Sequence, residues 1–258
     1  MNLWDSNSVK RFIAGSRWST NYKALVEFAY YDFCRFNGFE YEPTHYPKES
    51  KIPYVPLEKD IDELIVGFKN SKYLPLIQLL KESGFRPEEG FRLTSDDVDV
   101  DTKIVTLNCP AKHSLPRQFK MSDRLLAMML PLIRKTPHKE RLWGGTGRHI
   151  KRNFALIRNR TAKELCNPRL HKVTLGSLRH FYATKLYSQT KDVIFVQQRL
   201  GHKNIQNTMV YINLVNFSED DSFTVKVGST LEECTQLLEA GFTYVTDYED
   251  KKLFKKRK

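Results

Sequence analysis

The chain has 258 residues, and its 42 lysines and arginines outnumber its 30 aspartates and glutamates, which gives a formal net charge of +12. This excess favours polyanionic partners, with nucleic acid ahead of an anionic membrane surface. The sequence has no run of about 18 apolar residues and no signal-peptide pattern, so we expect a soluble cytoplasmic protein without a membrane partner. The four cysteines lie far apart with no CxxC pair, which argues against a zinc cluster and a disulfide framework.

The first 56 residues predict helices followed by a linker. We expect a short helix around residues 9–14 and a longer one that starts after the capping residue Ser19 and ends at Gly38. Residues 39–56 contain four prolines and no apolar period, which is typical of an extended linker. We therefore place a boundary near Ile52 and expect two domains, 1–52 and 53–258.

The remaining residues predict a mainly helical domain with a few strands. Apolar periodicity predicts helices over 57–68, 73–80, 122–134, 146–165, 177–188, 193–200 and 205–215. Valines and isoleucine around residues 101–103 predict a β-hairpin. Ser229 and Thr230 each precede a glutamate by three residues, which predicts a capped helix to about Ala240, and a second hairpin follows. The expected fold class is α+β, mainly α with a small β-sheet.

Two stretches in the C-terminal half combine residue types that suit phosphate chemistry. SLRHFYATKLY (177–187) places Arg179 and His180 near a predicted helix start, and LGHKNIQNTMVY (200–211) places His202 nine residues before Tyr211. Each residue alone is more often a structural or solvated group. In this order and spacing they resemble the tyrosine recombinase (phage-type integrase) family. The similarity extends from about residue 9 to the end, with a likeness to the archaeal integrases in particular.

The resemblance implies further site residues upstream. The first arginine of the family corresponds to Arg86 in SGFRPEEGFRL (83–93), with Glu89 as a supporting residue three positions later. The family lysine corresponds to Lys112 in AKHSLPRQF (111–119), five residues before Arg117. Lys103 is a weaker rival for the same role.

The resemblance also implies a reaction, the cleavage and rejoining of double-stranded DNA through a covalent bond between Tyr211 and a 3′ phosphate. A free tyrosine has a pKa of about 10, and phosphoryl oxygens gather negative charge in the transition state, so cations must surround the phosphate. Arg86 and Arg179 would bind the non-bridging oxygens and lower the pKa of the phenol. His202 would donate to the same oxygens and Lys112 would protonate the leaving 5′ oxygen, with no metal and no cofactor.

The family pattern is broken at one position. Gly176 stands three residues before Arg179, where the family usually has a histidine, and the loss of that proton acceptor is expected to slow the reaction by about 10²–10⁴-fold. His171 and His180 lie nearby, but we expect His180 to stabilise its helix rather than to act as a base. A catalytically impaired DNA-binding protein of the same fold and a type IB topoisomerase-like enzyme are the open alternatives.

Basic residues elsewhere are expected to contact DNA phosphates, with residues 1–52 forming a small helical clamp on the duplex. The predicted DNA contacts are Lys10, Arg11, Arg17, Lys23, Arg35, Arg117 and Lys203. The cationic end KKLFKKRK is expected to contact DNA or to dock on a neighbouring subunit. The resemblance implies a homotetramer on two DNA sites, a nucleoid-associated location and no small-molecule substrate. It leaves viral or plasmid integration, excision and chromosome-dimer resolution open as biological roles.

Overall fold

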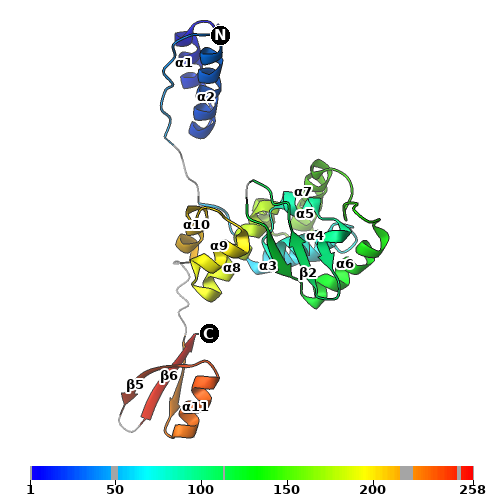
Figure 1. The fold of residues 1–258 in the computed structure, drawn as a ribbon, viewed down its shortest axis with the longest axis vertical. Helices are drawn as coiled ribbons and strands as arrows, with labels where there is room; N and C mark the ends of the chain where they lie inside the picture. Colours follow the sequence, from blue (N-terminus) through cyan, green and yellow to red (C-terminus); the bar gives the residue numbers. More distant parts are fainter. Residues whose placement is uncertain (1, 48–51, 113, 216–222, 249–250, 258) are drawn as a thin grey trace. The chain divides into compact units, whose positions relative to one another are not determined.

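The structure is a computed structural model that describes residues 2–47, 52–112, 114–215, 223–248 and 251–257 (Figure 1). Its residues form two compact units, Met1–Pro53 and Tyr54–Lys258. The predicted α+β class is confirmed, because helices dominate and the described strands form two small antiparallel sheets. Within the described residues, no helix combines the length and the apolar character that a membrane span requires.

The N-terminal unit is a pair of helices. α1 (Ser6–Gly15) starts at Asp5, and α2 (Thr20–Phe36) starts at the predicted cap Ser19, whose hydroxyl accepts from the Tyr22 backbone N–H. Figure 1 shows the two helices packed against each other. The buried apolar residues of this unit are Val9, Ile13, Tyr30 and Cys34. Because this core is small, large apolar side chains such as Phe28 and Phe36 are exposed, at 65% and 90%.

The helices of the second unit match the predicted set, with the short α5 and two 3₁₀ helices in addition. They are α3 (Glu58–Gly67), α4 (Leu74–Ser83), α5 (Pro87–Arg92), η1 (Ser95–Asp97), α6 (Asp123–Lys135), α7 (Gly147–Glu164), η2 (Pro168–Lys172), α8 (Leu175–Thr190), α9 (Val193–Leu200) and α10 (Gln206–Val215). α8 starts two residues earlier than predicted because Thr174 caps it, accepting from the Ser177 backbone N–H at 3.1 Å.

A small antiparallel sheet covers part of this helical core. It consists of β1 (Val98–Asp99), β2 (Ile104–Leu107) and β3 (Arg117–Lys120) in the order β1-β2-β3. The predicted hairpin around residues 101–103 is confirmed by the pairing of β1 with β2. β3 was not predicted, because its sequence RQFK lacks β-branched residues. The connection between β2 and β3, residues 108–116, carries Lys112.

The core of the second unit brings α4 and α8 into direct contact. Leu76, Leu80 and Leu178 are fully buried there, and each such side chain contributes about 1.5–3 kcal/mol of hydrophobic stabilisation. α4 ends at Gly84, whose φ is 63° and whose missing Cβ would lie 2.3 Å from the Tyr182 ring of α8. A glycine is therefore needed where the end of α4 approaches α8.

Residues 223–257 contain a second small sheet with one helix. β4 (Phe223–Gly228), β5 (Thr243–Tyr248) and β6 (Lys251–Arg257) pair in the order β4-β6-β5, and α11 (Leu231–Glu239) packs on one face. Thr230 caps α11 as predicted, and the β5–β6 hairpin is confirmed. β4 was not predicted, and residues 249 and 250 lie outside the described residues.

Candidate active site

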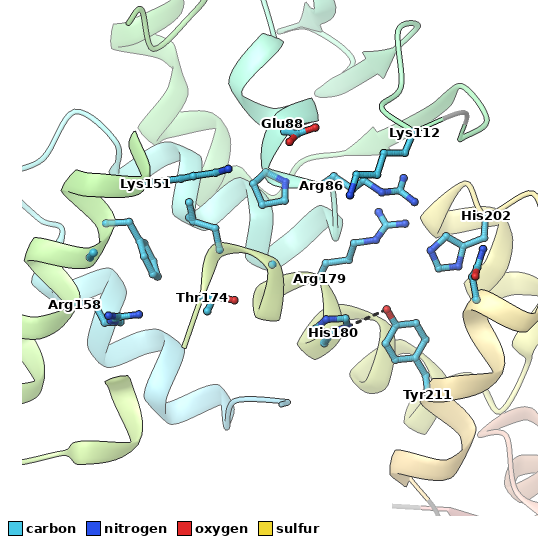
Figure 2. A pocket seen from close by; sticks show the side chains of 16 residues that line it. Arg86, Glu88, Lys112, Lys151, Arg158, Thr174, Arg179, His180, His202 and Tyr211 are labelled. Atoms are coloured by element: carbon cyan, nitrogen blue, oxygen red, sulfur yellow. Dashed lines mark hydrogen bonds between the residues drawn. The ribbon is translucent and has the colours of Figure 1, made fainter. Parts of the chain in front are cut away.

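A cavity of about 600 Å³ brings together the residues that were predicted to be catalytic (Figure 2). Arg86, Lys112, Arg179, His202 and Tyr211 all line it. They come from the start of α5, the β2–β3 connection, α8 and the α9–α10 region. Since these segments are distant in the sequence, the cavity exists only once they pack together.

Arg86 is held at the start of α5 by the carboxylate of Glu89. Glu89 is fully buried, accepts from the Arg86 backbone N–H at 2.7 Å and lies 3.3 Å from Arg86 Nη1. Arg86 Nη1 also donates to the hydroxyl of Ser114 on the β2–β3 connection. The guanidinium is therefore oriented at the cavity wall by contacts from two segments, and Figure 2 shows it pointing towards Arg179 and Lys112.

Glu89 also binds Arg117, which was predicted to contact DNA, and a DNA contact of this residue stays a prediction. Arg117 Nη2 donates to Glu89 at 2.5 Å, and the Arg117 side chain is only 6% exposed. Its guanidinium also lies 4.8 Å from the centre of the Phe85 ring. Burial tends to raise the pKa of Glu89, but the hydrogen bond and charge of Arg117 outweigh it and the net shift is downward. Arg117 thus keeps the carboxylate beneath the site ionised.

Arg179 is buried and is held by two backbone carbonyls. Its Nη1 donates to the Gly84 carbonyl at 2.7 Å and its Nη2 to the Leu200 carbonyl at 2.9 Å. Burial, followed by the charges of Arg86 and Arg117, lowers the pKa of Arg179 to about 9, so the side chain is cationic at neutral pH. A buried cation beside other cations is stabilised by a bound anion, so the cavity favours an anionic ligand.

Lys112 reaches the cavity from the β2–β3 connection, whereas Lys103 pairs with an aspartate of α6 and does not line the wall. The connection is fastened to the end of α9, because the Leu115 N–H donates to the Gly201 carbonyl at 3.0 Å. Gly201 has a φ of 68°, and a Cβ there would lie 2.9 Å from the Leu115 carbonyl oxygen. The glycine that precedes His202 therefore allows this close approach.

His202 is a buried, neutral histidine. Its Nδ1 lies 2.9 Å from the Thr208 hydroxyl. Burial, followed by the charges of Arg179 and Arg86, lowers the pKa of His202 to about 3. If the Thr208 hydroxyl donates to Nδ1, the ring proton resides on Nε2, so the imidazole has one N–H donor for an oxygen ligand.

Tyr211 is buried on α10, and its hydroxyl points at His180 (Figure 2). The Tyr211 Oη and His180 Nδ1 atoms are 3.1 Å apart, and the two ring centroids are 5.9 Å apart. Burial raises the pKa of Tyr211, although the charges of Arg179 and Arg86 oppose this rise. The structure thus differs from the expectation that His180 merely stabilises its helix, because its ring contacts the candidate nucleophile.

Gly176 lies in the first turn of α8, lines the cavity and leaves open space in it. Among the described residues, a Cβ built at this position would come within 4 Å of Thr174 Oγ1 alone, at 3.7 Å. His171 lies on η2 with its Nδ1 3.2 Å from Asn159 Oδ1, and it is not part of the cavity wall. His171 therefore does not occupy the place of the missing family histidine.

One face of α7, which carries two basic and two apolar residues, also lines the cavity and was not predicted to do so. Lys151, Phe154, Ala155 and Arg158 all line the cavity, because spacings of three and four residues put them on one helix face. Arg158 Nη1 donates to the Val173 carbonyl at 2.9 Å. The seven-residue spacing of Lys151 and Arg158 is a signal that could have revealed this face. It is hidden in the sequence because other basic residues surround the same helix.

The remaining predicted DNA contacts lie at or near the surface of their own units. Those with exposed side chains are Arg11, Arg17, Arg35 and Lys203. Lys10 and Lys23 are half-buried, with their ammonium groups 5.0 Å from the centre of the Tyr41 ring and 2.8 Å from the Ala14 carbonyl oxygen. Contact of these residues with DNA stays a prediction.

The cavity combines cationic donors with a buried phenol beside an imidazole. Guanidinium forks bind the oxygens of a phosphate or a similar oxyanion, and fixed cations stabilise charge that develops on those oxygens. A phenol in such surroundings is suited to attack phosphorus. The model of the phage integrase family matches residues 57–216, a range that contains all five predicted catalytic residues and more than half of the chain. The chain belongs to the phage integrase family.

Relatives of this integrase-family chain are tyrosine recombinases. It is 26% identical over 177 residues to the tyrosine recombinase of Pseudothermotoga lettingae, covering 67% of this chain and 60% of the relative. It is 26% identical over 197 residues to tyrosine recombinase XerC of Bacillus subtilis, covering 67% of this chain and 62% of the relative. The chain therefore spans less than two thirds of the length of either relative.

Solved structures of recombinases share the fold of this integrase-family chain. The crystal structure of XerA recombinase has a TM-score of 0.53 at 20% identity and covers 96% of this chain and 84% of that one. XerH site-specific recombinase in a post-cleavage complex with palindromic difH substrate has a TM-score of 0.62 at 17% identity, covering 91% and 72%. At these identities the likeness concerns the fold, and the predicted archaeal placement stays a prediction.

Proposed function

We propose that this chain cleaves and rejoins double-stranded DNA at specific sites through a covalent bond between Tyr211 and a 3′ phosphate. The observation that carries the proposal is the convergence of the five predicted side chains on one cavity, with the phenol at its wall. The fold neighbour XerH is described in a post-cleavage complex with its difH substrate, which supports DNA as the substrate class.

The scissile phosphate is proposed to lie between Arg86 and Arg179. Each guanidinium presents a planar fork to the non-bridging oxygens, and both forks are oriented by protein contacts before the substrate arrives. Preorganised donors favour the transition state because they stabilise charge as it grows without having to move. Burial, followed by repulsion from Arg86, lowers the pKa of Arg179 in the unbound site, and a bound anion relieves this repulsion.

The neutral His202 and the ammonium of Lys112 complete the proposed cleavage step. His202, with Thr208 at its Nδ1, donates from Nε2 to a phosphoryl oxygen. Lys112 protonates the departing 5′ oxygen, so that a 5′ hydroxyl leaves and can later attack the phosphotyrosine to rejoin the strand. Arg86, Arg179 and Lys112 supply the charge stabilisation that a metal ion supplies in other phosphoryl-transfer sites, and we propose that no metal takes part.

The proposed partners are duplex DNA and further copies of this chain. Exposed cations of the N-terminal unit, among them Arg11, Arg17 and Arg35, are proposed to contact the phosphate backbone. Such contacts release counterions, so the affinity for DNA is expected to fall steeply with salt. A homotetramer on two DNA sites follows from the family resemblance.

The test is covalent trapping on DNA. The Tyr211→Phe protein would first be used to enrich bound duplexes from a random pool, because this variant can bind DNA but cannot attack it. Wild-type protein would then be incubated with a nicked suicide duplex that carries the enriched sequence, and the products would be separated on a denaturing gel. We expect a protein–DNA adduct with wild type and none with Tyr211→Phe.

The same experiment separates the enzyme from the alternatives. DNA bound by wild-type protein without any adduct would indicate a binding protein of the same fold, the alternative that Gly176 favours. Relaxation of supercoiled plasmid without any requirement for paired sites would indicate a topoisomerase-like activity instead.

A further inference from the structure

The Tyr211 phenol needs a proton acceptor before it can attack phosphorus. Burial raises the pKa of this phenol, so at neutral pH the hydroxyl is protonated. The position that supplies a histidine in the family is Gly176 here, which has no side chain to take the proton. The acceptor must therefore come from another residue in the wall of the cavity.

His180 is placed to be that acceptor. Its Nδ1 lies 3.1 Å from Tyr211 Oη, within the reach that proton transfer requires. The two side chains project from α8 and α10, which pack against each other, so the contact is set by helix packing. Figure 2 shows the Tyr211 hydroxyl aimed at the edge of the His180 ring.

The surroundings of His180 keep its ring neutral. Burial, followed by the charge of Arg179, lowers the pKa of His180, so the ring is neutral at neutral pH. In a neutral ring that carries its proton on Nε2, Nδ1 is an acceptor for the Tyr211 hydroxyl. The charged groups of the described wall are Arg179 on the same helix, Arg86 and Glu88 at the start of α5, Lys112 of the β2–β3 connection, and Lys151 and Arg158 of α7.

Two other described histidines near the site, His202 and His171, are engaged elsewhere. Nδ1 of His202 lies 2.9 Å from the Thr208 hydroxyl, and its pKa of about 3 makes its ring a poor acceptor. His171 contacts Asn159 and is not part of the cavity wall. His180 is thus the histidine in the described wall whose ring nitrogen meets the phenol oxygen.

We propose that His180 takes the proton of Tyr211 in place of the histidine that Gly176 lacks. This inference rests on the proposed function. In the step, the Tyr211 O–H bond breaks and its proton moves to His180 Nδ1 while the phenol oxygen bonds to phosphorus. The P–O5′ bond breaks, and Lys112 gives a proton to the departing 5′ oxygen. On rejoining, His180 returns its proton to the tyrosine.

The kinetic test compares single-turnover rates of adduct formation on the nicked suicide duplex. The His180→Asn variant retains an oxygen acceptor near the position of Nδ1 but cannot take up a proton. We expect its rate to fall by at least about 10²-fold. His171→Asn, a histidine outside the cavity, is the matched control and should leave the rate unchanged. Equal DNA affinity of wild type and His180→Asn shows that the variant is folded.

A substrate with a 5′-bridging sulfur distinguishes the base from the acid. Sulfur leaves without protonation, so this duplex should restore the rate of Lys112→Ala but not that of His180→Asn.

A second variant tests proton transfer directly, because open space at Gly176 accepts a side chain. Gly176→His placed in the His180→Asn background should raise the rate at least tenfold.

The outcomes separate this inference from the function on which it rests. No adduct with wild-type protein on bound DNA overturns the proposed function itself. An adduct with wild type, together with a His180→Asn rate within threefold of it, overturns the role of His180 and leaves the function standing. Restoration of His180→Asn by the sulfur substrate, or no gain from Gly176→His in that background, also counts against a proton acceptor.

Discussion

The two sides of the cavity are built differently. On the cationic side, the guanidiniums of Arg86 and Arg179 are held by carbonyl and hydroxyl oxygens from other segments and, for Arg86, by the carboxylate of Glu89 in the adjoining helix α5. On the nucleophile side, Tyr211 packs in a small cluster with residues of α8 and α9 and meets the ring of His180. The cationic side is therefore anchored by several polar contacts, whereas the nucleophile depends on the packing of one helix.

This difference follows from what each side must do. Cations that stabilise charge on phosphoryl oxygens act best when they do not move during the reaction. In the proposed reaction the phenol oxygen forms a bond to phosphorus and releases it again, so its surroundings have to tolerate a change of position and charge. We therefore expect substitutions on the cationic side to affect stability and rate together, and those on the nucleophile side to affect mainly the rate.

The largest effect is expected from Arg179→Ala. Loss of a buried guanidinium that we propose to bind the phosphate should lower the rate of adduct formation by about 10³-fold. The Gly84 and Leu200 carbonyls also lose their donor, so the protein should unfold at a lower temperature. Suicide-duplex kinetics and thermal unfolding measure the two effects. Arg160→Ala, an exposed arginine of α7, is the matched control, and an unchanged rate in Arg179→Ala would remove this residue from the site.

A strong effect on stability is expected from Glu89→Gln. The neutral side chain leaves Arg117 buried without its carboxylate, which should lower the free energy of unfolding by about 3 kcal/mol. The pKa of Glu89 is lowered in the folded state, so its contribution is complete above its ordinary pKa of 4.5 and is lost as the pH falls through the folded value. Wild type should therefore lose stability on acidification more steeply than Glu89→Gln in urea titrations.

The exposed Glu164→Gln is the control for Glu89→Gln, because that carboxylate pairs with Arg160 on the surface of α7. Its stability should lie within about 0.5 kcal/mol of wild type. If Glu89→Gln matched this control at neutral pH, the carboxylate beneath Arg86 would not anchor the cationic side.

A smaller effect is expected from Thr208→Val on the nucleophile side. Without the Thr208 hydroxyl at Nδ1, the ring proton of His202 is no longer held on Nε2. The loss of one hydrogen bond corresponds to at most about a tenfold change in rate. Suicide-duplex kinetics measure it, with Thr190→Val at the exposed end of α8 as control. A loss as large as that of Arg179→Ala would contradict the division between the two sides.

The smallest effect is expected from removing metal ions. If the cations of the site supply all the charge stabilisation, excess EDTA should change the rate of adduct formation by less than twofold, because no metal step is removed. The same suicide-duplex assay, with and without added Mg²⁺ after chelation, measures this. A rate that collapses in EDTA and returns with Mg²⁺ would show that the cationic side is incomplete.

Much of the fold could be predicted from the sequence because its signals are local. Apolar spacing located α2, α7 and α9, and caps such as Ser19 and Thr230 marked helix starts. β3 was missed because RQFK lacks β-branched residues and takes its strand conformation from pairing with β2. β4 was missed although FTVKVG contains the valines and threonine that are typical of strands. The short α5 was also missed, because six residues are too few to show a helical period.

The spacing of family motifs located the residues of the candidate site, but it did not show which of their side chains contact one another. The sequence indicated Arg117 as a DNA contact, yet its guanidinium lies on the buried Glu89. His180 was expected to stabilise its helix, yet its ring meets the Tyr211 hydroxyl. Neither relation has a local signal, because the partners are 28 and 31 residues apart in the sequence.

By itself the sequence determined the helical framework, the basic character and the order of the residues that carry the chemistry. These are properties of spacing and composition, which depend on residues close together in the sequence. The tertiary structure alone decided which side chain faces which, because hydrogen-bond distance depends on how α8 packs against α4 and α10. The open space at Gly176 is created by that packing. The contact between the His180 imidazole and Tyr211 also depends on it, because proton transfer requires atoms about 3 Å apart.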